Sequence, residues 1–322
     1  MRNDHYALGA GRVLDYLADE FDEDGVSRSD PDNVQFYYKM PAVFAYGDRR
    51  KLALKTLEQF EHRFVKDGGL ALDNDPIARP WSAYLAGWAA WGAAMLGRFD
   101  TARRITAGVG DSQDDRWGGL WHDEGGTRVM DTERSSAAAM GLLWSGDVER
   151  TRRICAFLDR ALAARPRDDL FYAYFDAEMR PHANEKDRNT YFDRKDAHAR
   201  PALFATPIAS LVWFGRMTGD TGAFDTAAKY MDFILAHEDA ARLPLATKTG
   251  WGALMLSQHV ADGRLGDFAR RSGDNLMDRL REDGSIDFDA VVDVPKPVAK
   301  VWLMGWCSDV ALTLMALGHG SA

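Results

Sequence analysis

The sequence has few cysteines and no concentrated basic charge, and these absences exclude several classes of protein. Cys155 and Cys307 are the only cysteines among 322 residues, and they lie far apart in the chain. A disulfide framework or a cysteine zinc site is therefore not expected. The formal net charge is -9 and no run of five or six basic residues occurs. This composition argues against a general nucleic-acid binder.

Long apolar runs are also absent. No segment reaches about 18 consecutive apolar residues, so the sequence predicts no membrane span. The first residues, MRNDHYALGAGRVLDYLADEF, are polar and amphipathic and do not resemble a signal peptide. No glycine-rich phosphate loop follows an expected strand, which disfavours a nucleotide cofactor. We therefore expect a cytoplasmic protein that needs no cofactor and whose partner is a small-molecule substrate rather than a nucleic acid or a membrane.

Helical periodicity dominates the chain, and the expected helices are of two kinds. One kind is amphipathic, with apolar residues at positions i, i+3, i+4 and i+7 that form one buried stripe. Its members are residues 5–21, 48–65, 99–109, 147–165, 222–238 and 265–282. The other kind is apolar nearly all round and rich in small residues, which predicts burial on every side. Its members are residues 34–47, 80–97, 135–146, 200–219, 249–261 and 298–317.

The two kinds alternate, six of each, as a degenerate repeat of roughly 50 residues. Short Gly-Asp turns such as GDRR and SGDVE lead from an apolar helix to the next amphipathic one, whereas the opposite connections are long. This pattern predicts an all-α fold, an (α/α)6 toroid of inner and outer helices, as a single domain over residues 1–322. An open solenoid is the alternative, but neither end of the chain carries an atypical polar capping repeat.

Three stretches in the long connections alternate apolar and polar residues between glycines. They are residues 118–129, 170–179 and 284–294. Each is predicted to form a small β-hairpin over the end of the toroid where the long loops gather.

Two segments resemble known toroidal proteins. RMTGDTGAFDTAAKYMDFILAH, residues 216–237, is similar to the helix-turn-helix unit of six-hairpin glycosidases, N-acylglucosamine 2-epimerases and terpenoid-cyclase-like toroids. REDGSIDF, residues 281–288, resembles the glycine-containing turn that follows outer helices in terpenoid cyclases. The resemblance implies a pocket at the mouth of the toroid, formed by the N-termini of the inner helices and the long loops.

The sequence also departs from these families. It lacks the Asp-x-Asp-Asp acid motif of squalene-type cyclases, the Asp-rich magnesium motif of prenyl diphosphate enzymes, and the paired zinc ligands of protein prenyltransferases and lanthionine cyclases. No catalytic residue is therefore carried over from the resemblance.

Aromatic and cationic residues recur where the long loops enter the apolar helices. The predicted substrate-binding residues are Tyr37, Tyr38, Lys39, Arg79, Trp81, Lys248, Trp251, Lys300 and Trp302. Helix N-termini favour anions, so a ring of cations there, with Arg200 as a further member, predicts an electropositive mouth for an anionic or electron-rich ligand. The alternative is that the cations are solvated loop residues and the tryptophans pack in the core.

The candidates for proton transfer lie in two loops. The predicted catalytic residues are His198, His122, Tyr191, Asp193 and Asp123, because a histidine beside carboxylates is the usual acid/base arrangement. The alternative is a solvated polar loop. The spacing of His122, Asp123, His182 and His198 matches no recognised metal site, so no metal is expected.

Three functions from different classes fit these patterns. The leading one is a cofactor-independent acid/base enzyme, of isomerase, lyase or cyclase type, acting on a small anionic organic molecule. The second is a carbohydrate-active enzyme, either a glycosidase or a sugar epimerase. A glycosidase needs two carboxylates about 5 to 9.5 Å apart, for which Asp75, Asp131, Glu133 and Asp193 are available. The third is a toroid that binds without catalysis.

Cys307, in the last apolar helix, has two interpretations. It is either a buried inert thiol or a catalytic nucleophile.

Overall fold

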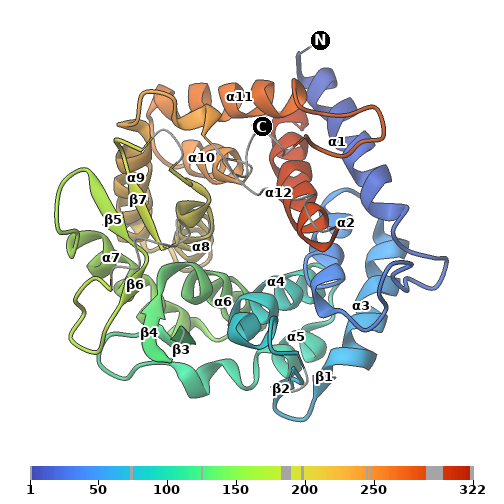
Figure 1. Cartoon of the computed structure of the whole chain (residues 1–322), viewed down its shortest axis with the longest axis horizontal. Coiled ribbons are helices and arrows are strands. Elements are labelled where there is room, and N and C mark those ends of the chain that lie inside the picture. Colours follow the sequence, from blue (N-terminus) through green and yellow to red (C-terminus); the bar gives the residue numbers. More distant parts are fainter. Residues whose placement is uncertain are drawn as a thin grey trace.

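The α-helices of the protein form a ring in two layers (Figure 1). The structure is a computed structural model and describes residues 2–72, 75–124, 126–182, 190–196, 199–243, 246, 248–287 and 300–319. The inner helices are α2 (Met40–Tyr46), α4 (Ser82–Met95), α6 (Thr132–Ser145), α8 (Ala202–Thr218), α10 (Thr249–Ser257) and α12 (Lys300–Gly318). The outer helices are α1 (Arg2–Ala18), α3 (Arg50–Phe64), α5 (Phe99–Thr106), α7 (Val148–Ala163), α9 (Thr221–Leu235) and α11 (Gly263–Met277). Short 3-10 helices cover Val34–Phe36, Arg79–Trp81, Val109–Ser112 and Ala240–Arg242.

The ring is closed. Each inner helix packs against the next one along the chain, and α12 returns to contact α2 as well as α10. Helix α1 lies along α12, so the first and last helices form the sixth pair, as Figure 1 shows. The toroid prediction is therefore confirmed, and the open solenoid is wrong.

Two of the short turns have the predicted chemistry, whereas α3 and α5 begin after Arg49 and Arg98 without a side-chain cap. Gly146 ends α6 in the left-handed region, with φ at 97°, and the Asp147 side chain then accepts a hydrogen bond from the Arg150 N–H at the start of α7. Gly219 and Asp220 play the same two roles between α8 and α9. A glycine that stops one helix and an aspartate that caps the next make these two reversals compact.

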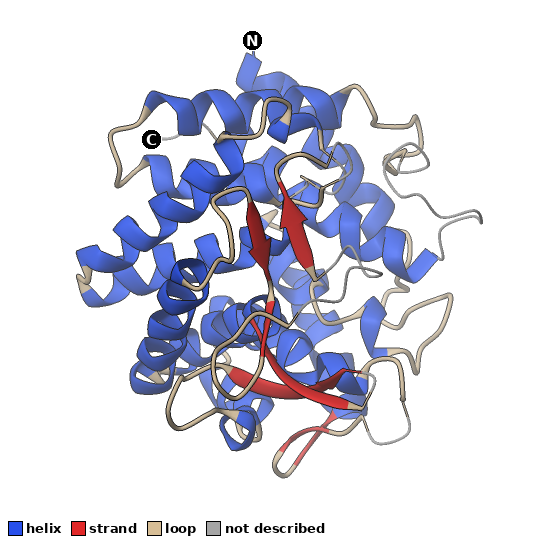
Figure 2. Ribbon diagram, turned by 60° about the vertical axis from the view of Figure 1, so that its left-hand side comes forward, coloured by secondary structure: helices blue, strands red, loops and turns tan. Residues whose placement is uncertain are grey.

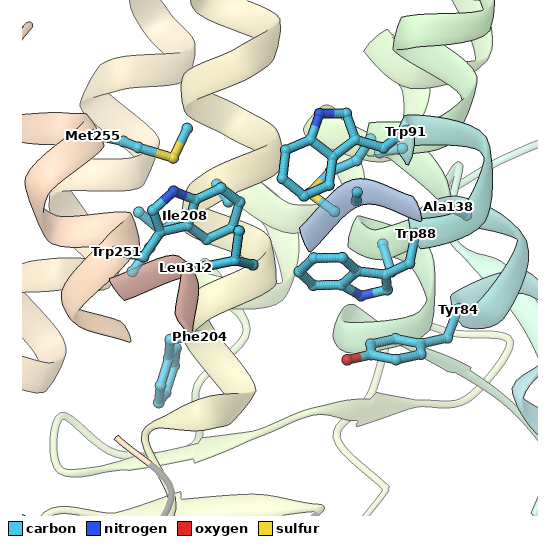
Figure 3. Packing of buried hydrophobic residues seen from close by; sticks show 14 of the residues in the cluster. Tyr84, Trp88, Trp91, Ala138, Phe204, Ile208, Trp251, Met255 and Leu312 are labelled. Carbon is cyan, nitrogen blue, oxygen red and sulfur yellow. The ribbon is translucent and has the colours of Figure 1, made fainter. Parts of the chain in front are cut away.

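Large aromatic side chains fill the centre of the ring. Trp88 and Trp91 on α4 meet Trp251 on α10, and the rings of Trp91 and Trp251 stack with centroids 5.6 Å apart (Figure 3). Helix α12 is long and apolar enough to cross a membrane by length and composition alone, but most of it is buried inside the ring. Its place in the toroid accounts for its apolar surface.

Short strands lie in the connections opposite the Gly-Asp turns, and Figure 2 shows them beside the helices. They are β1 (Val65–Lys66), β2 (Gly69–Leu70), β3 (Leu120–Glu124), β4 (Thr127–Asp131), β5 (Leu170–Tyr172), β6 (Tyr174–Phe175) and β7 (Tyr191–Asp193). The β3–β4 hairpin confirms the prediction for residues 118–129, whereas the β1–β2 hairpin was not predicted.

The predicted hairpin over residues 170–179 is wrong. Strand β5 pairs with β7 and strand β6 pairs with β4, so the two halves of this stretch belong to different sheets. The alternating pattern identified the strands, but their partners come from elsewhere in the long connections. Most of the third predicted hairpin, residues 284–294, lies outside the described residues.

Candidate functional site

A cavity of about 530 Å³ opens at the end of the toroid where the inner helices begin. Lining side chains come from the N-terminal part of all six inner helices or from the residues just before them. They are Gln35, Tyr38, Lys39, Ile77, Ala78, Trp81, Tyr84, Leu85, Glu133, Arg200, Ala202, Leu203, Lys248, Val301, Trp302, Gly305, Trp306 and Asp309. We call this cavity the mouth pocket. It lies where the resemblance to known toroids places a pocket.

Lys248 caps the start of α10 and is buried. Its ammonium group donates to the Tyr84 hydroxyl at 3.0 Å and to the Glu133 carboxylate at 3.2 Å. Burial by itself would lower the pKa of Lys248, but Tyr84, Asp309 and Glu133 together raise it well above its usual value. Lys248 is therefore a permanent cation, and it holds Glu133 in the first turn of α6 at the pocket wall.

Lys39, just before α2, is the second buried cation of the mouth pocket. Its ammonium group donates to the Asp309 carboxylate at 2.6 Å and to the Gly305 carbonyl at 3.0 Å, both on α12. The Asp309 side chain is 4% exposed, whereas that of Glu133, the partner of Lys248, is 17% exposed. Of the two carboxylates, Glu133 is the one more open to a ligand.

Aromatic rings separate the two ion pairs. The Trp88 ring lies 5.0 Å from the Lys39 ammonium and 5.9 Å from the Lys248 ammonium, which suits cation–π attraction to both. Tyr38 and Tyr84 pack with ring centroids 5.9 Å apart. Burial raises the pKa of each of these two phenols, so both are protonated hydrogen-bond donors near neutral pH.

The expected ring of cations is corrected by these contacts. Lys39, Lys248 and Arg200 do line one pocket, but the two lysines are neutralised by carboxylates of the protein itself. A buried ammonium group needs a close anion, and the fold supplies one for each. An electropositive mouth is therefore wrong as the explanation of the two buried lysines, and the argument for an anionic ligand loses its main support.

Four of the predicted substrate-binding residues lie outside the mouth pocket. Tyr37 is buried against Phe21 and Phe64, and its hydroxyl accepts a hydrogen bond from the Ser27 N–H. Trp251 belongs to the aromatic core. The remaining two, Arg79 and Lys300, have exposed side chains, and Lys300 pairs with Glu20. The other five, Tyr38, Lys39, Trp81, Lys248 and Trp302, line the pocket, and their substrate-binding role stays a prediction.

His122 and Asp123 line a different cavity, of about 620 Å³, between α4, α5 and the β3–β4 hairpin. His122 lies against Arg134, which also donates to Asp131 at 2.7 Å and stacks 3.9 Å above the Trp81 ring. Asp123 accepts from the Gly126 N–H and so caps the hairpin turn. Arg134 thus connects His122 to Trp81, which lines the mouth pocket, while His122 and Asp123 themselves do not line it. Their catalytic role stays a prediction.

Tyr191 and Asp193 flank Phe192 on β7. Phe192 packs into the core against Phe204 and Phe233, and alternation along a strand turns its two neighbours to the opposite face. Asp193 there pairs with Arg167 at 3.4 Å. Neither residue lines the mouth pocket. His198 lies outside the described residues, and its catalytic role stays a prediction.

Two side chains that bond the buried lysines, Tyr84 and Asp309, were not predicted from the sequence. Asp309 is a lone acidic residue on the otherwise apolar helix α12, and a charge in such a place requires a partner. Lys248 at the start of the apolar helix α10 is a similar case. In both cases the sequence indicates that the charge needs a partner, but it does not identify which residue that partner is. Tyr84 carries no comparable signal, because tyrosine is common in helical cores.

Neither cysteine lines the mouth pocket. Cys307 is buried on α12, and burial raises the pKa of its thiol to about 12, which marks it as inert rather than nucleophilic. Within the described ranges, no group of three or more histidine, cysteine, aspartate or glutamate side chains could hold a metal ion. The expected independence from metals stays a prediction.

Solved structures with the same architecture include enzymes of several kinds. An alpha-1,6-mannanase of Salegentibacter sp. matches with a TM-score of 0.69 and 14% identity, over 97% of this chain and 98% of the other. A D-mannose isomerase matches with a TM-score of 0.66 and 10% identity, over 95% and 96%. A type II terpene cyclase from Scytonema matches with a TM-score of 0.63 and 13% identity, over 99% and 98%.

No family model and no curated protein matches the sequence. At identities of 10 to 14%, the structural likeness establishes the fold and leaves the activity open. The protein is an α/α toroid of the kind shared by these mannanases, isomerases and cyclases.

Proposed function

We propose that the protein is an acid/base enzyme that isomerises or epimerises a small sugar in the mouth pocket. The observation that carries this proposal is the cluster of Tyr84, Lys248 and Glu133. It combines a partly open carboxylate and a protonated phenol, each within hydrogen-bonding distance of a fixed cation. Proton transfer next to a carbonyl carbon needs these three functions and no nucleotide.

Each member of the cluster has one role in this reaction. Glu133 takes the proton from the carbon beside the carbonyl, and the carbonyl oxygen gains a proton, which gives an enediol. In isomerisation Glu133 returns its proton to the former carbonyl carbon while the neighbouring hydroxyl loses its proton and becomes the new carbonyl. In epimerisation the enediol turns over in the pocket before Glu133 returns the proton to the same carbon. The Tyr84 hydroxyl accepts from Lys248 and hydrogen-bonds the Tyr38 hydroxyl, and with a substrate bound it donates its hydrogen to the carbonyl oxygen instead of to Tyr38. The Lys248 cation stabilises the negative charge that develops on that oxygen. Trp81, Trp302 and Trp306 supply the aromatic surface on which sugar rings pack.

A glycoside hydrolase is the second candidate, because Asp309 supplies another carboxylate in the same pocket. Hydrolysis needs two carboxyl groups that flank the scissile bond. Asp309 is already engaged by Lys39 and is nearly inaccessible, so it is poorly placed for that role. The isomerase proposal uses only the accessible carboxylate and is therefore preferred.

Deuterium incorporation tests the proposal. The protein is incubated in D₂O with D-mannose, D-glucose, D-fructose and N-acetylglucosamine, and exchange at C2 or C1 is followed by proton NMR. We expect exchange into one of these sugars, and we expect Glu133→Gln to slow it about 10²- to 10⁴-fold, the usual contribution of a general base. The glutamine amide oxygen can still accept from Lys248, so the melting temperature should change by only a few degrees.

Glu58→Gln is the matched control, because Glu58 is an exposed glutamate on the outer helix α3. It should exchange deuterium at the wild-type rate. Release of reducing ends from mannan without deuterium at C2 would instead identify a hydrolase. Binding of a sugar with neither outcome would leave a toroid that binds without catalysis, and would end the isomerase proposal.

A further inference from the structure

Polarity in the mouth pocket changes with depth. The buried lining residues include Lys39, Lys248 and Asp309, which carry full charges. The most exposed apolar lining residues are Ile77, which is 68% exposed, and Trp302, which is 47% exposed. The pocket is therefore charged at its floor and apolar at its rim, the reverse of an ordinary solvent-facing cleft.

The apolar rim is unusual for the protein as a whole. Within the described part of the chain, five large hydrophobic side chains are strongly exposed: Leu8, Ile77, Phe99, Met217 and Trp302. Two of the five border this one pocket, although they come from segments more than 200 residues apart in the sequence. Exposed apolar groups that gather at a concave site indicate a ligand that covers them.

The rim is built on fixed backbone. The Asp75 carboxylate accepts hydrogen bonds from the Ile77 and Ala78 N–H groups at 3.0 and 2.8 Å, which holds the turn that presents Ile77. Trp302 stands in the first turn of α12, one turn before Trp306, with the two ring centroids 6.5 Å apart. Val301, its neighbour on α12, also lines the pocket. An apolar surface on such supports is preorganised, so a ligand that covers it loses little binding energy to rearrangement.

We propose that the mouth pocket binds an amphiphilic substrate, a sugar whose far end carries an alkyl, acyl or aryl group that packs between Ile77 and Trp302. This inference rests on the proposed function, since it places the sugar at the floor beside Glu133. The cavity volume of about 530 Å³ falls within the range of about 300–1,000 Å³ that encloses drug-sized ligands. The substituent lies away from the carbons at which protons are transferred, which corresponds to C6 of a hexose.

Paired C6 derivatives test this inference. Calorimetric titration compares 6-O-methyl-mannose with 6-O-hexyl-mannose, and the glucose pair is measured in the same way. Each buried methylene strengthens binding roughly fourfold, so burial of even two predicts that the hexyl ether binds at least about tenfold more tightly. Ile77→Ser should remove most of this gain while leaving the affinity for the methyl ether within about twofold. Trp302→Ser should also remove most of the gain, but it should weaken the binding of both ethers, because Trp302 belongs to the surface on which the sugar ring packs.

Leu8→Ser is the matched control, because Leu8 is 71% exposed on α1 and does not line the pocket. It should keep the full gain. Equal affinity for the two ethers, no binding of either, or a gain that survives both rim variants would overturn the apolar subsite. Deuterium exchange into free sugars without a hexyl gain would leave the proposed function standing. A rim-dependent hexyl gain without exchange would support the subsite and end the isomerase proposal.

Discussion

The charged groups of Lys39 and Asp309 are both buried, and each is stabilised there by the opposite charge of the other. Two charges that are buried together lose their hydration, and their mutual attraction roughly offsets that loss. Removing one partner leaves an uncompensated charge in the core, which costs about 3–5 kcal/mol. Removing Glu133 should cost less free energy than removing Asp309, because the Glu133 carboxylate is partly hydrated and the Lys248 ammonium group also donates to the Tyr84 hydroxyl.

Substitution of Lys39 tests this dependence. We expect Lys39→Met to lower the free energy of unfolding by about 3–5 kcal/mol, and the double variant Lys39→Met/Asp309→Leu to recover most of the loss, because no charge then remains buried. Urea denaturation followed by circular dichroism measures both. Lys55→Met is the control, since the ion pairs of Lys55 with Asp24 and Glu58 are both exposed and the substitution should cost less than about 1 kcal/mol. If Lys39→Met and Lys55→Met lowered the free energy of unfolding equally, the mutual dependence of Lys39 and Asp309 would be refuted.

At the scale of helices, the inner ring depends on close backbone contact between α4 and α6. A Cβ atom at Gly87 would lie 1.9 Å from the Ala137 carbonyl oxygen, and one at Gly141 would lie 2.7 Å from the Gly87 Cα. Neither neighbour is a flexible side chain, so a methyl group at either position must push the two helices apart. This contact explains why the inner helices are rich in glycine and alanine.

Gly87→Ala should therefore destabilise the protein by more than about 2 kcal/mol, the scale of overpacking in a rigid core. Gly11→Ala on α1 is the matched control, because nothing lies within 4 Å of its added Cβ. There the higher helix propensity of alanine should raise stability by about 0.5–1 kcal/mol. Thermal unfolding measures the melting temperature of both variants. A shift of the melting temperature in the same direction for both would contradict the close contact between α4 and α6.

The helices and their order were predictable because they depend on local information. A helix with one apolar stripe belongs to the outer layer, and a helix that is apolar on all sides belongs to the inner layer. Gly-Asp turns such as Gly146–Asp147 mark where one helix ends and the next begins. Strand pairing was less predictable, because residues 170–175 form strands whose partners lie in other parts of the chain. A strand pattern does not specify its neighbour.

At the scale of the whole molecule, the mouth pocket is assembled from residues far apart in the sequence. Lys39 meets Asp309 across 270 positions, and Lys248 meets Glu133 across 115. The sequence shows that helix starts carry cations and aromatic residues, but it does not show that carboxylates neutralise two of those cations. Only closure of the ring, which brings α12 back to α2, determines the charge balance of the pocket.

Burial of titratable groups throughout the ring also determines how the molecule responds to alkali. Burial raises the pKa of the Cys155 thiol and of the Tyr38, Tyr84 and Tyr230 phenols, and it raises the pKa of Cys307 to about 12. In the unfolded chain these groups begin to lose their protons above about pH 8.5 for cysteine and pH 10 for tyrosine. The folded protein keeps the protons to higher pH. The unfolded state then binds fewer protons than the folded state, so stability falls as the pH rises.

We therefore expect the melting temperature to be nearly constant between about pH 7 and 8 and to fall progressively from about pH 9 to 11, since each retained proton costs about 1.4 kcal/mol per pH unit. Differential scanning calorimetry across this range measures the fall. Cys155→Ala removes one such group on the outer helix α7, away from the mouth pocket, so its melting temperature should decline less steeply above pH 9 than that of the wild type. The slope is compared rather than the absolute value, because loss of the sulfur atom also weakens packing. A melting temperature that stays constant up to pH 11, or equal slopes for the two proteins, would show that buried thiols and phenols do not govern alkaline stability.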